Sequence, residues 1–267
     1  MSQSDESDPQ YLYKYRSLWG KSKIWVMRTV LFDELYFSSP AEFNDPYDCS
    51  PVFANSATQD EYERSLKSLV ERSRSHLSRP ERRRQTRALL KAPNLRSEEF
   101  LANVREKVQH VLNSTGVLSL SETGENILMW SHYADYHKGI CLRFRGTSTT
   151  PFFGLAQRVI YQRERPSLNV ITDDPTSRAE KALLTKADFW SYEKEWRIIR
   201  YEDGGGQNCG IQIYPNEYLD GIIFGARISE VDKSDVVSWV KRRKNPVQLL
   251  QADLDPDTFR IVLSNYP

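Results

Sequence analysis

The amino-acid sequence predicts an α+β fold with a helical insert. Segments with the two-residue alternation of strands lie near both ends of the chain. Between about residues 60 and 112, in contrast, the chain contains no glycine and carries leucines at helical intervals. The 267-residue chain is long enough to bury a substantial core. We therefore expect a single α+β domain of the catalytic type over residues 11–267, with the insert inside it.

A strand, a helix and a second strand are expected first. Tyrosine occupies every second position from residue 11 to residue 15, which is the period of a strand. Lys14 and Arg16 then lie on the opposite face of that strand. The amphipathic residues 23–32 predict a helix, and residues 35–39 predict a second strand, which ends where prolines interrupt regular pairing.

The insert is expected to form two or three helices, because Pro80 and Pro93 interrupt it. From Arg72 to Lys91 it holds eight basic residues and one acidic residue, Glu81. Such a run is typical of a solvated helix face or a mobile linker, and it also fits a phosphate-binding surface. The candidates for nucleic-acid contacts are Arg79, Arg82, Arg83, Arg84 and Arg87.

The second half of the chain returns to strands. Alternating or buried-looking segments predict strands at residues 116–122, 140–144, 195–202, 211–215, 221–225 and 259–263. Helices are expected at residues 126–139, at residues 177–189 and from Ser229, where Asp232 completes an approximate capping box.

Composition narrows the class of protein. Thirty-seven basic and 36 acidic side chains leave a net charge of +1, which excludes a wholly basic nucleic-acid coat protein but not a local basic patch. No apolar run reaches the roughly 18–20 residues of a membrane span, and the polar residues 1–10 predict a disordered tail and no signal peptide. We expect a cytoplasmic protein with no membrane partner. Four histidines and three cysteines without metal-ligand spacing predict no metal site.

Three short segments carry the side chains that chemistry needs. In the first, residues 43–48, the acceptors Asn44, Asp45 and Asp48 stand among prolines. They could orient a hydroxylated ligand, or they could form an ordinary Asx turn.

The second segment is the helix expected at residues 126–139. Helical spacing places Trp130, Tyr133 and His137 on one stripe, and His132 with Tyr136 on another. Aromatic stripes usually belong to a core, but two histidines add polar groups that favour a ligand-binding face.

The third segment contains Glu193 and Glu195, which lie two residues apart at the start of a strand and so project to one face. One carboxylate could stabilise a developing cation while the other moves a proton. The alternative is an exposed pair that is matched by Lys194 and Arg197.

Taken together, these segments resemble the bacterial family known as domain of unknown function 2971. The likeness is carried by LYKYRSL, LYFSSPAEFNDPYD, GVLSLSE followed by MWSHYADYHKGICLRF, and YEKEWRII. This resemblance covers most of the chain outside the basic insert and the tail, and it implies no activity.

The order of elements is also similar to that of the ADP-ribosyltransferases, especially the toxins that modify DNA. In those toxins a strand of type LYHxT precedes a helix and a second strand, and the catalytic glutamate begins a strand of type EFLV, where Glu195 stands here. The chain departs from the family because Lys14 replaces the opening histidine, with Arg16 on the same face. The serine motif matches either Ser38 with Ser39 or Ser119 with Ser121.

This second resemblance implies an ADP-ribosyltransferase-like split β-sheet core and NAD as the substrate. It implies that Glu195 is the catalytic carboxylate, that Glu193 faces the acceptor, and that Tyr133 or Trp130 stacks on nicotinamide. The residues that would bind NAD are Lys14, Arg16, Ser38, Ser39, Asn44, Asp45, Trp130, His132, Tyr133 and His137.

The biological role that follows from this likeness is a toxin or phage-defence effector. Its acceptor would be a macromolecule, with DNA and RNA among the candidates, and a protein partner could inhibit or activate the effector. A related activity is that of an NAD glycohydrolase. Two other classes stay open. One is a binding module that uses the basic insert and performs no chemistry, and the other is a metal-dependent nuclease using Asp45, Asp48, Glu193 and Glu195.

Overall fold

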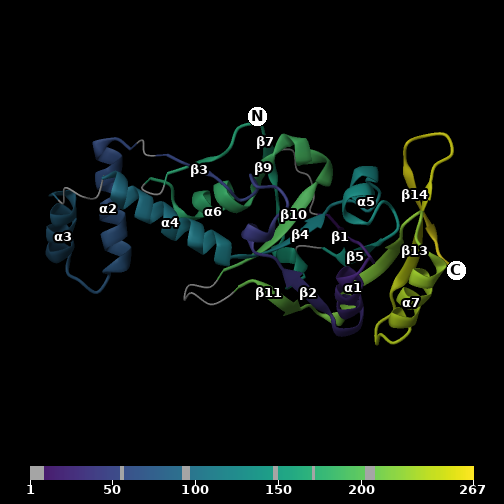
Figure 1. Ribbon diagram of the computed structural model, residues 1–267. Coiled ribbons are helices and arrows are strands. Elements are labelled where there is room, and N and C mark those ends of the chain that lie inside the picture. Colours follow the sequence, from purple (N-terminus) through teal and green to yellow (C-terminus); the bar gives the residue numbers. More distant parts are fainter. Residues whose placement is uncertain (1–8, 55–56, 92–96, 147–149, 170–171, 202–207) are drawn as a thin grey trace.

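A mixed sheet of eight strands forms the centre of the molecule (Figure 1). The computed structural model describes residues 9–54, 57–91, 97–146, 150–169, 172–201 and 208–267, so most of the predicted tail lies outside the described residues. From one edge to the other, the strands are β14 (Ile261–Asn265), β13 (Gln248–Leu254), β12 (Leu219–Phe224), β5 (Ile140–Arg145), β1 (Tyr11–Arg16), β4 (Gly116–Ser121), β10 (Glu195–Arg200) and β6 (Gln157–Arg158). Neighbouring strands are antiparallel except for β12 and β13.

The sheet is divided near its middle. β1 pairs with β5 along all six of its residues, and β4 pairs in the same way with β10. β1 and β4 share one ladder pair, Tyr13 opposite Ser121. Within these two strands, which are both fully described, residues 14–16 of β1 therefore have no ladder partner on β4. The predicted α+β class is confirmed, whereas the ADP-ribosyltransferase-like split core stays a prediction.

The two faces of the sheet carry separate hydrophobic cores. On one face, Leu12 and Leu118 pack with Val26 of α1 (Lys21–Phe32) and Val236 of α7 (Glu230–Val240). On the other face, Tyr15 and Cys141 pack with Trp130 of α5 (Ile127–Tyr133), so that α1 and α7 lie across the sheet from α5 (Figure 1). The alternation predicted for β1 is thus observed, because Leu12 and Tyr15 belong to opposite cores.

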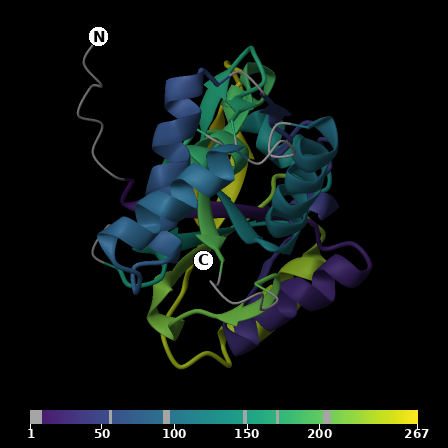
Figure 2. The ribbon, with the colours of Figure 1, turned by 90° about the vertical axis from the view of Figure 1, so that its left-hand side faces the viewer.

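Helices fill the segment of the insert, which extends away from the sheet (Figure 1), so that in Figure 2 these helices face the viewer. They are α2 (Gln59–Ser73), α3 (Arg79–Lys91) and α4 (Glu98–Ser114). A capping box between Thr58 and Glu61 begins α2, which buries Tyr62, Leu66 and Val70 at four-residue intervals. α3 packs against α2 and has no buried residue.

Short elements complete the fold around the sheet. Three two-stranded pieces are β2 (Glu34–Phe37) with β11 (Gly210–Ile213), β3 (Val52–Phe53) with β8 (Ser167–Leu168), and β7 (Ile160–Gln162) with β9 (Thr185–Ala187). Single-turn 3₁₀ helices are η1 (Pro40–Glu42), η3 (Phe153–Leu155) and η5 (Asn216–Tyr218), and η4 (Asp188–Glu193) is longer.

Two predicted helices end early. The segment 177–189 divides into α6 (Pro175–Leu183), β9 and η4, because residues 185–187 pair in parallel with β7. The helix predicted over residues 126–139 ends at Tyr133, because three consecutive residues, Asp135, Tyr136 and His137, adopt positive φ angles. The strand β13 was not predicted.

Candidate active site

A cleft opens where β1 and β4 part, with a volume of about 420 Å³. It is lined by Lys14 and Arg16 of β1, by Ser119 and Ser121 of β4 and by Glu195 of β10, among others. The Lys14 ammonium donates a hydrogen bond of 2.6 Å to the backbone carbonyl of Ser119. A side chain therefore connects the two strands at a point where they have no backbone ladder.

Two glutamates lie side by side at one end of this cleft. Glu195 begins β10, opposite Ser121, and Glu193 is the last residue of η4. Lys194, between them, has a left-handed backbone with φ of 44°, so the pair is not part of one extended strand as the sequence suggested. The two carboxylates nevertheless converge on one ammonium group, since Lys186 Nζ lies 2.6 Å from Glu193 Oε2 and 3.0 Å from Glu195 Oε2.

These glutamates belong to a buried charge cluster formed by Asp48, Lys186, Glu193, Glu195 and Arg197. The Arg197 guanidinium donates to both oxygens of Glu195, at 2.8 and 2.9 Å, and to Asp48 at 2.6 Å. Lys186 lies 3.5 Å from Asp48. None of the five side chains is more than 7% exposed. Three acids against two bases leave the cluster with one net negative charge.

The alternative of an exposed glutamate pair matched by Lys194 and Arg197 is therefore wrong about the exposure and about Lys194, whereas Arg197 does pair with Glu195. The side chain of Lys194 is 59% exposed and lies 3.9 Å from Glu122 instead. Buried carboxylates need closely matched cations, because removing charge from water costs several kcal/mol per ion. Lys186 and Arg197 supply that match within the protein.

The environment separates the pKa values of the two glutamates. Burial raises the pKa of Glu195, but the charges of Arg197 and Lys186 outweigh burial and lower it to about 2. For Glu193, burial outweighs the neighbouring ammonium and raises the pKa above its ordinary value. Two carboxyl groups whose pKa values move apart are suited to different roles, one as a fixed charge and the other as a proton carrier.

Tyr133 and His132 complete the cleft from the last turn of α5. The Tyr133 hydroxyl donates a hydrogen bond of 2.6 Å to Glu193 Oε1. His132 Nδ1 is hydrogen-bonded at 2.9 Å to the hydroxyl of Tyr192. The C-terminal end of this short helix thus holds Glu193 in place and presents a ring to the cleft.

At the other end of the cleft, Arg16 has no carboxylate within ion-pair distance among the residues that the structure describes. Burial lowers the pKa of its guanidinium to about 10, which leaves it charged at neutral pH. Burial and the charge of Arg16 lower the pKa of Lys14 well below its usual value. A charged, desolvated guanidinium without an anionic partner is suited to binding an anion such as phosphate.

Residues 129–198 match a family model described as protein of unknown function (DUF2971). The chain is similar to that family over a segment that runs from α5 into β10 and includes both glutamates. Comparison with curated proteins gives no match, and comparison with solved structures gives none either. No helix in the described ranges has the length and the apolar character required to cross a membrane.

The structure brings together many of the side chains that the sequence singled out. Those that line the cleft are Lys14, Arg16, Ser38, Asn44, His132, Tyr133, Glu193 and Glu195. Of the two candidate serine motifs, Ser119 and Ser121 both line the cleft, and Ser119 lowers the pKa of Glu195. Ser39 does not line the cleft, because its hydroxyl caps η1 and donates to the carbonyl of Asn113. The geometry therefore favours the pair on β4.

Three other predicted residues lie outside the cleft. Asp45 forms the Asx turn with the N–H of Tyr47 and accepts a hydrogen bond of 2.8 Å from the indole of Trp190. Trp130 is fully buried and donates to the carbonyl of Gly124, so it offers no face to a ligand. His137 stacks against Trp130, because the left-handed turn after α5 returns the chain to it. The expected stripe through Trp130 and His137 is therefore part of the core.

Sequence reasoning missed Lys186 and assigned Arg197 only to an exposed pair. Arg197 could have been found, because it follows Glu195 by two residues and so shares its face of β10. Lys186 could not, because it stood inside a predicted helix.

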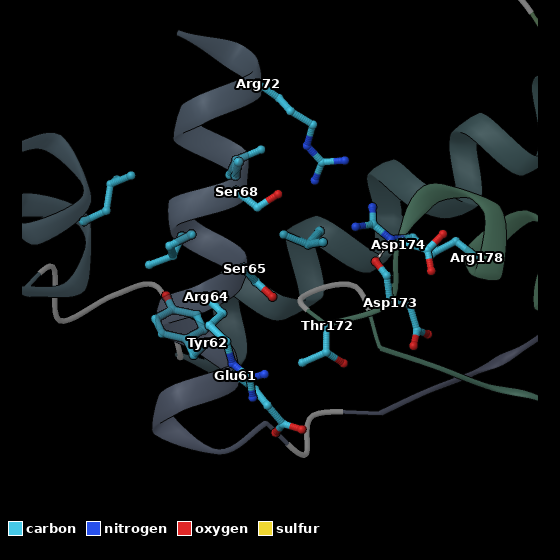
Figure 3. Close-up of a pocket in the computed structure, with 14 residues that line it drawn as sticks. Glu61, Tyr62, Arg64, Ser65, Ser68, Arg72, Thr172, Asp173, Asp174 and Arg178 are labelled. Carbon is cyan, nitrogen blue, oxygen red and sulfur yellow. Dashed lines mark hydrogen bonds between the residues drawn. The ribbon is translucent and has the colours of Figure 1, made fainter. Parts of the chain in front are cut away.

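A second, larger cavity of about 690 Å³ lies between the insert and the start of α6 (Figure 3). Arg64 and Arg72 of α2 lie across it from Asp173 and Asp174. None of the predicted NAD-binding residues lines it. No group of three or more His, Cys, Asp or Glu side chains suited to a metal ion occurs in the described part of the chain.

Proposed function

We propose that the protein is an NAD-dependent ADP-ribosyltransferase whose site is the cleft between β1 and β4. The observation that carries this proposal is one cavity that holds a permanently charged carboxylate, a proton-binding carboxyl and a cation without an anionic partner. A transferase that acts on NAD can use all three: the charged carboxylate faces the positive charge that develops on the ribose, the carboxyl takes the proton of the acceptor hydroxyl, and the cation binds the diphosphate.

Each side chain has a role in that reaction. Arg16, with Lys14 beside it, would bind the diphosphate, and Tyr133 would lie against the nicotinamide in place of the buried Trp130. The net negative charge around Glu195 would stabilise the oxocarbenium-like ribose as nicotinamide departs. Glu193 would take the proton of the attacking hydroxyl. Water as the acceptor would give an NAD glycohydrolase.

Glu195 already accepts three hydrogen bonds from buried cations, two from Arg197 and one from Lys186. These fix the carboxylate and keep it charged. Ser119, which also lines the cleft, lowers the pKa of Glu195, and its hydroxyl can rotate. A ribose hydroxyl would therefore take the place of Ser119 beside the carboxylate without disturbing the cluster.

The experiment that tests this proposal follows nicotinamide release from NAD by chromatography, with and without nucleic acid and cell lysate. Wild-type protein is expected to release nicotinamide, and Glu195→Gln is expected to lose at least about a hundred-fold in rate, as when one electrostatic catalytic group is removed. Glu217→Gln, at an exposed glutamate, is the matched control. Absence of release from folded wild-type protein under every condition would contradict the proposal.

The surface of α3 supports a nucleic-acid acceptor, and it also supports a second candidate function, a binding module without chemistry. Lys67, Arg79, Arg82, Arg83 and Arg87 border a hollow of about 290 Å³ between α2 and α3. An effector of the toxin or phage-defence kind that modifies nucleic acid would use this surface to hold its acceptor, and a protein partner would inhibit or activate it. In a binding module the same arginines would act while Glu195→Gln had no effect.

A metal-dependent nuclease is the third candidate and is the least favoured. Asp48, Glu193 and Glu195 do converge, but the Lys186 ammonium takes the position among their oxygens that a divalent cation would need. Asp45 lies apart, bound to Trp190. Nuclease activity that requires added Mg²⁺ or Mn²⁺ would revive this candidate.

A further inference from the structure

A hollow of about 340 Å³, distinct from the large cavity beside the insert, adjoins the cleft and is lined by residues of α1, β2 and η1. It shares Arg16, Ser38 and Glu42 with the cleft, so these three residues lie at the junction of the two cavities. Each volume lies in the range of roughly 300–1,000 Å³ that is usual for small-molecule sites. A ligand held at Arg16 can therefore extend in two directions.

Two aromatic side chains, Trp25 and Tyr36, line this second hollow, which we call the aromatic hollow. Their ring centroids are 5.8 Å apart and their planes are tilted by 45°. Trp25 is 43% exposed, although it lies on the side of α1 that borders a cavity. The Tyr36 hydroxyl donates to Glu42, at 3.2 Å to Oε1, which holds that ring at the junction. The Arg28 guanidinium lies 5.8 Å from the centroid of the Trp25 ring. An exposed tryptophan that lines a cavity is suited to stacking on a flat heterocycle.

Carboxylates border the same hollow. Glu34 is held by Arg28, with Nε 2.6 Å from Oε2 and Nη2 3.0 Å from Oε1. Glu42 is held by the capping box at Ser39. Fixed carboxylates are the usual acceptors for ribose hydroxyls in nucleotide sites. A base-stacking surface, ribose acceptors and a phosphate-binding guanidinium thus follow one another from the aromatic hollow into the cleft.

We infer that the aromatic hollow binds the second nucleoside of a dinucleotide, with its base against Trp25 and its diphosphate at Arg16. For NAD this nucleoside is adenosine, and in that respect the inference rests on the proposed function. The cleft alone has room for the nicotinamide ribonucleotide half. The protein therefore selects a dinucleotide over a mononucleotide through a surface that takes no part in bond cleavage.

Calorimetric titration with three probes, NAD, ADP and nicotinamide mononucleotide, tests this inference. Trp25→Leu is expected to weaken the binding of NAD and ADP by about ten-fold, the loss of one base–aromatic stack. The affinity for nicotinamide mononucleotide should stay within about two-fold, because that probe occupies the cleft alone. Trp19→Leu, at a tryptophan that is 80% exposed and borders neither cavity, is the matched control.

The outcomes separate this inference from the proposed function. Binding of ADP that depends on Trp25, in a protein that never releases nicotinamide, would support the hollow and contradict the transferase. Release of nicotinamide with a KM that Trp25→Leu leaves unchanged would support the transferase and overturn the hollow. Failure of the wild-type protein to bind ADP, or equal weakening of all three probes, would also overturn the inference.

Discussion

The charge cluster and the surface of α3 hold basic side chains in opposite ways. In the cluster, Arg197 is fully buried, and its three hydrogen bonds to Glu195 and Asp48 are 2.6–2.9 Å long. On α3, five arginines lie on a helix without a buried residue, and none is ion-paired to a carboxylate in the described ranges.

This difference separates two uses of charge. Buried ion pairs hold a geometry, because moving either partner leaves the other charge uncompensated. Exposed arginines hold no geometry and are free to exchange counterions for the phosphates of a polyanion. We therefore assign chemistry to the first region and recognition to the second, and substitutions in the two regions should affect different measurements.

The largest effect on stability is expected from Arg197→Met. The change leaves Asp48 and Glu195 without their main cation, and the loss of one partner of a buried pair typically costs about 3–5 kcal/mol. Urea denaturation at pH 7 measures the free energy of unfolding. Arg84→Met on α3 makes the same chemical change at an exposed site and should alter that free energy by less than about 0.5 kcal/mol. Equal effects of the two substitutions would remove the distinction between the regions.

A smaller effect is expected from acid. The pKa of Glu195 is about 2 in the folded protein, below its ordinary value of 4.5. A depressed acid pKa stabilises the fold above the unfolded pKa, and this contribution is lost as pH falls toward the folded pKa. The stability gap between wild type and Glu195→Gln should therefore shrink by about 3 kcal/mol between pH 5 and pH 2.

The raised pKa of Glu193 has the opposite effect on stability, because protonation of this group in acid favours the folded state. It therefore limits the loss of stability of the wild type as pH falls. Glu193→Gln should accordingly make acid more destabilising than it is for the wild type. Urea denaturation at pH 7, 5, 3 and 2 checks both signs. A stability gap between wild type and Glu195→Gln that does not change with pH would show that Glu195 has an ordinary pKa.

The parts of this site that could be predicted are those set by local periodicity. The alternation in β1 separated Lys14 and Arg16 from the tyrosines. Glu193 and Glu195 lie together as expected because they are close in sequence, although a left-handed turn at Lys194, and not the period of a strand, connects them. Neither inference needed contacts from distant parts of the chain.

The rest depended on long-range contacts and on backbone turns. Lys186 joins the cluster because β9 pairs with β7, some 25 residues earlier in the chain, and nothing local distinguishes its segment from a helix. The aromatic stripe failed because apolar spacing continues past Tyr133 while the backbone turns at Asp135. Arg197 is buried because Asp48 and Cys49 close over it, and a sequence pattern carries no information about such cover.

The smallest effect on stability, together with a large effect on binding, is expected from neutralising Arg82, Arg83 and Arg84 to glutamine. Arg83 stands four residues from both Arg79 and Arg87, and like charges at this spacing repel by a few tenths of a kcal/mol. The triple variant should therefore be as stable as the wild type or slightly more stable. Its affinity for single-stranded nucleic acid should depend less on salt, with the slope of log K against log salt reduced by about 2.

The matched control for this variant lies in the first region. Glu195→Gln should leave the salt dependence of nucleic-acid binding unchanged while it abolishes nicotinamide release. The triple variant should reduce that salt dependence and leave nicotinamide release unchanged when water is the acceptor. If neutralising the arginines left the salt slope intact, α3 would be a solvated helix face, and recognition of the acceptor would have to lie elsewhere. If it stopped nicotinamide release without an acceptor present, the two regions would be coupled, and the division between chemistry and recognition would not hold.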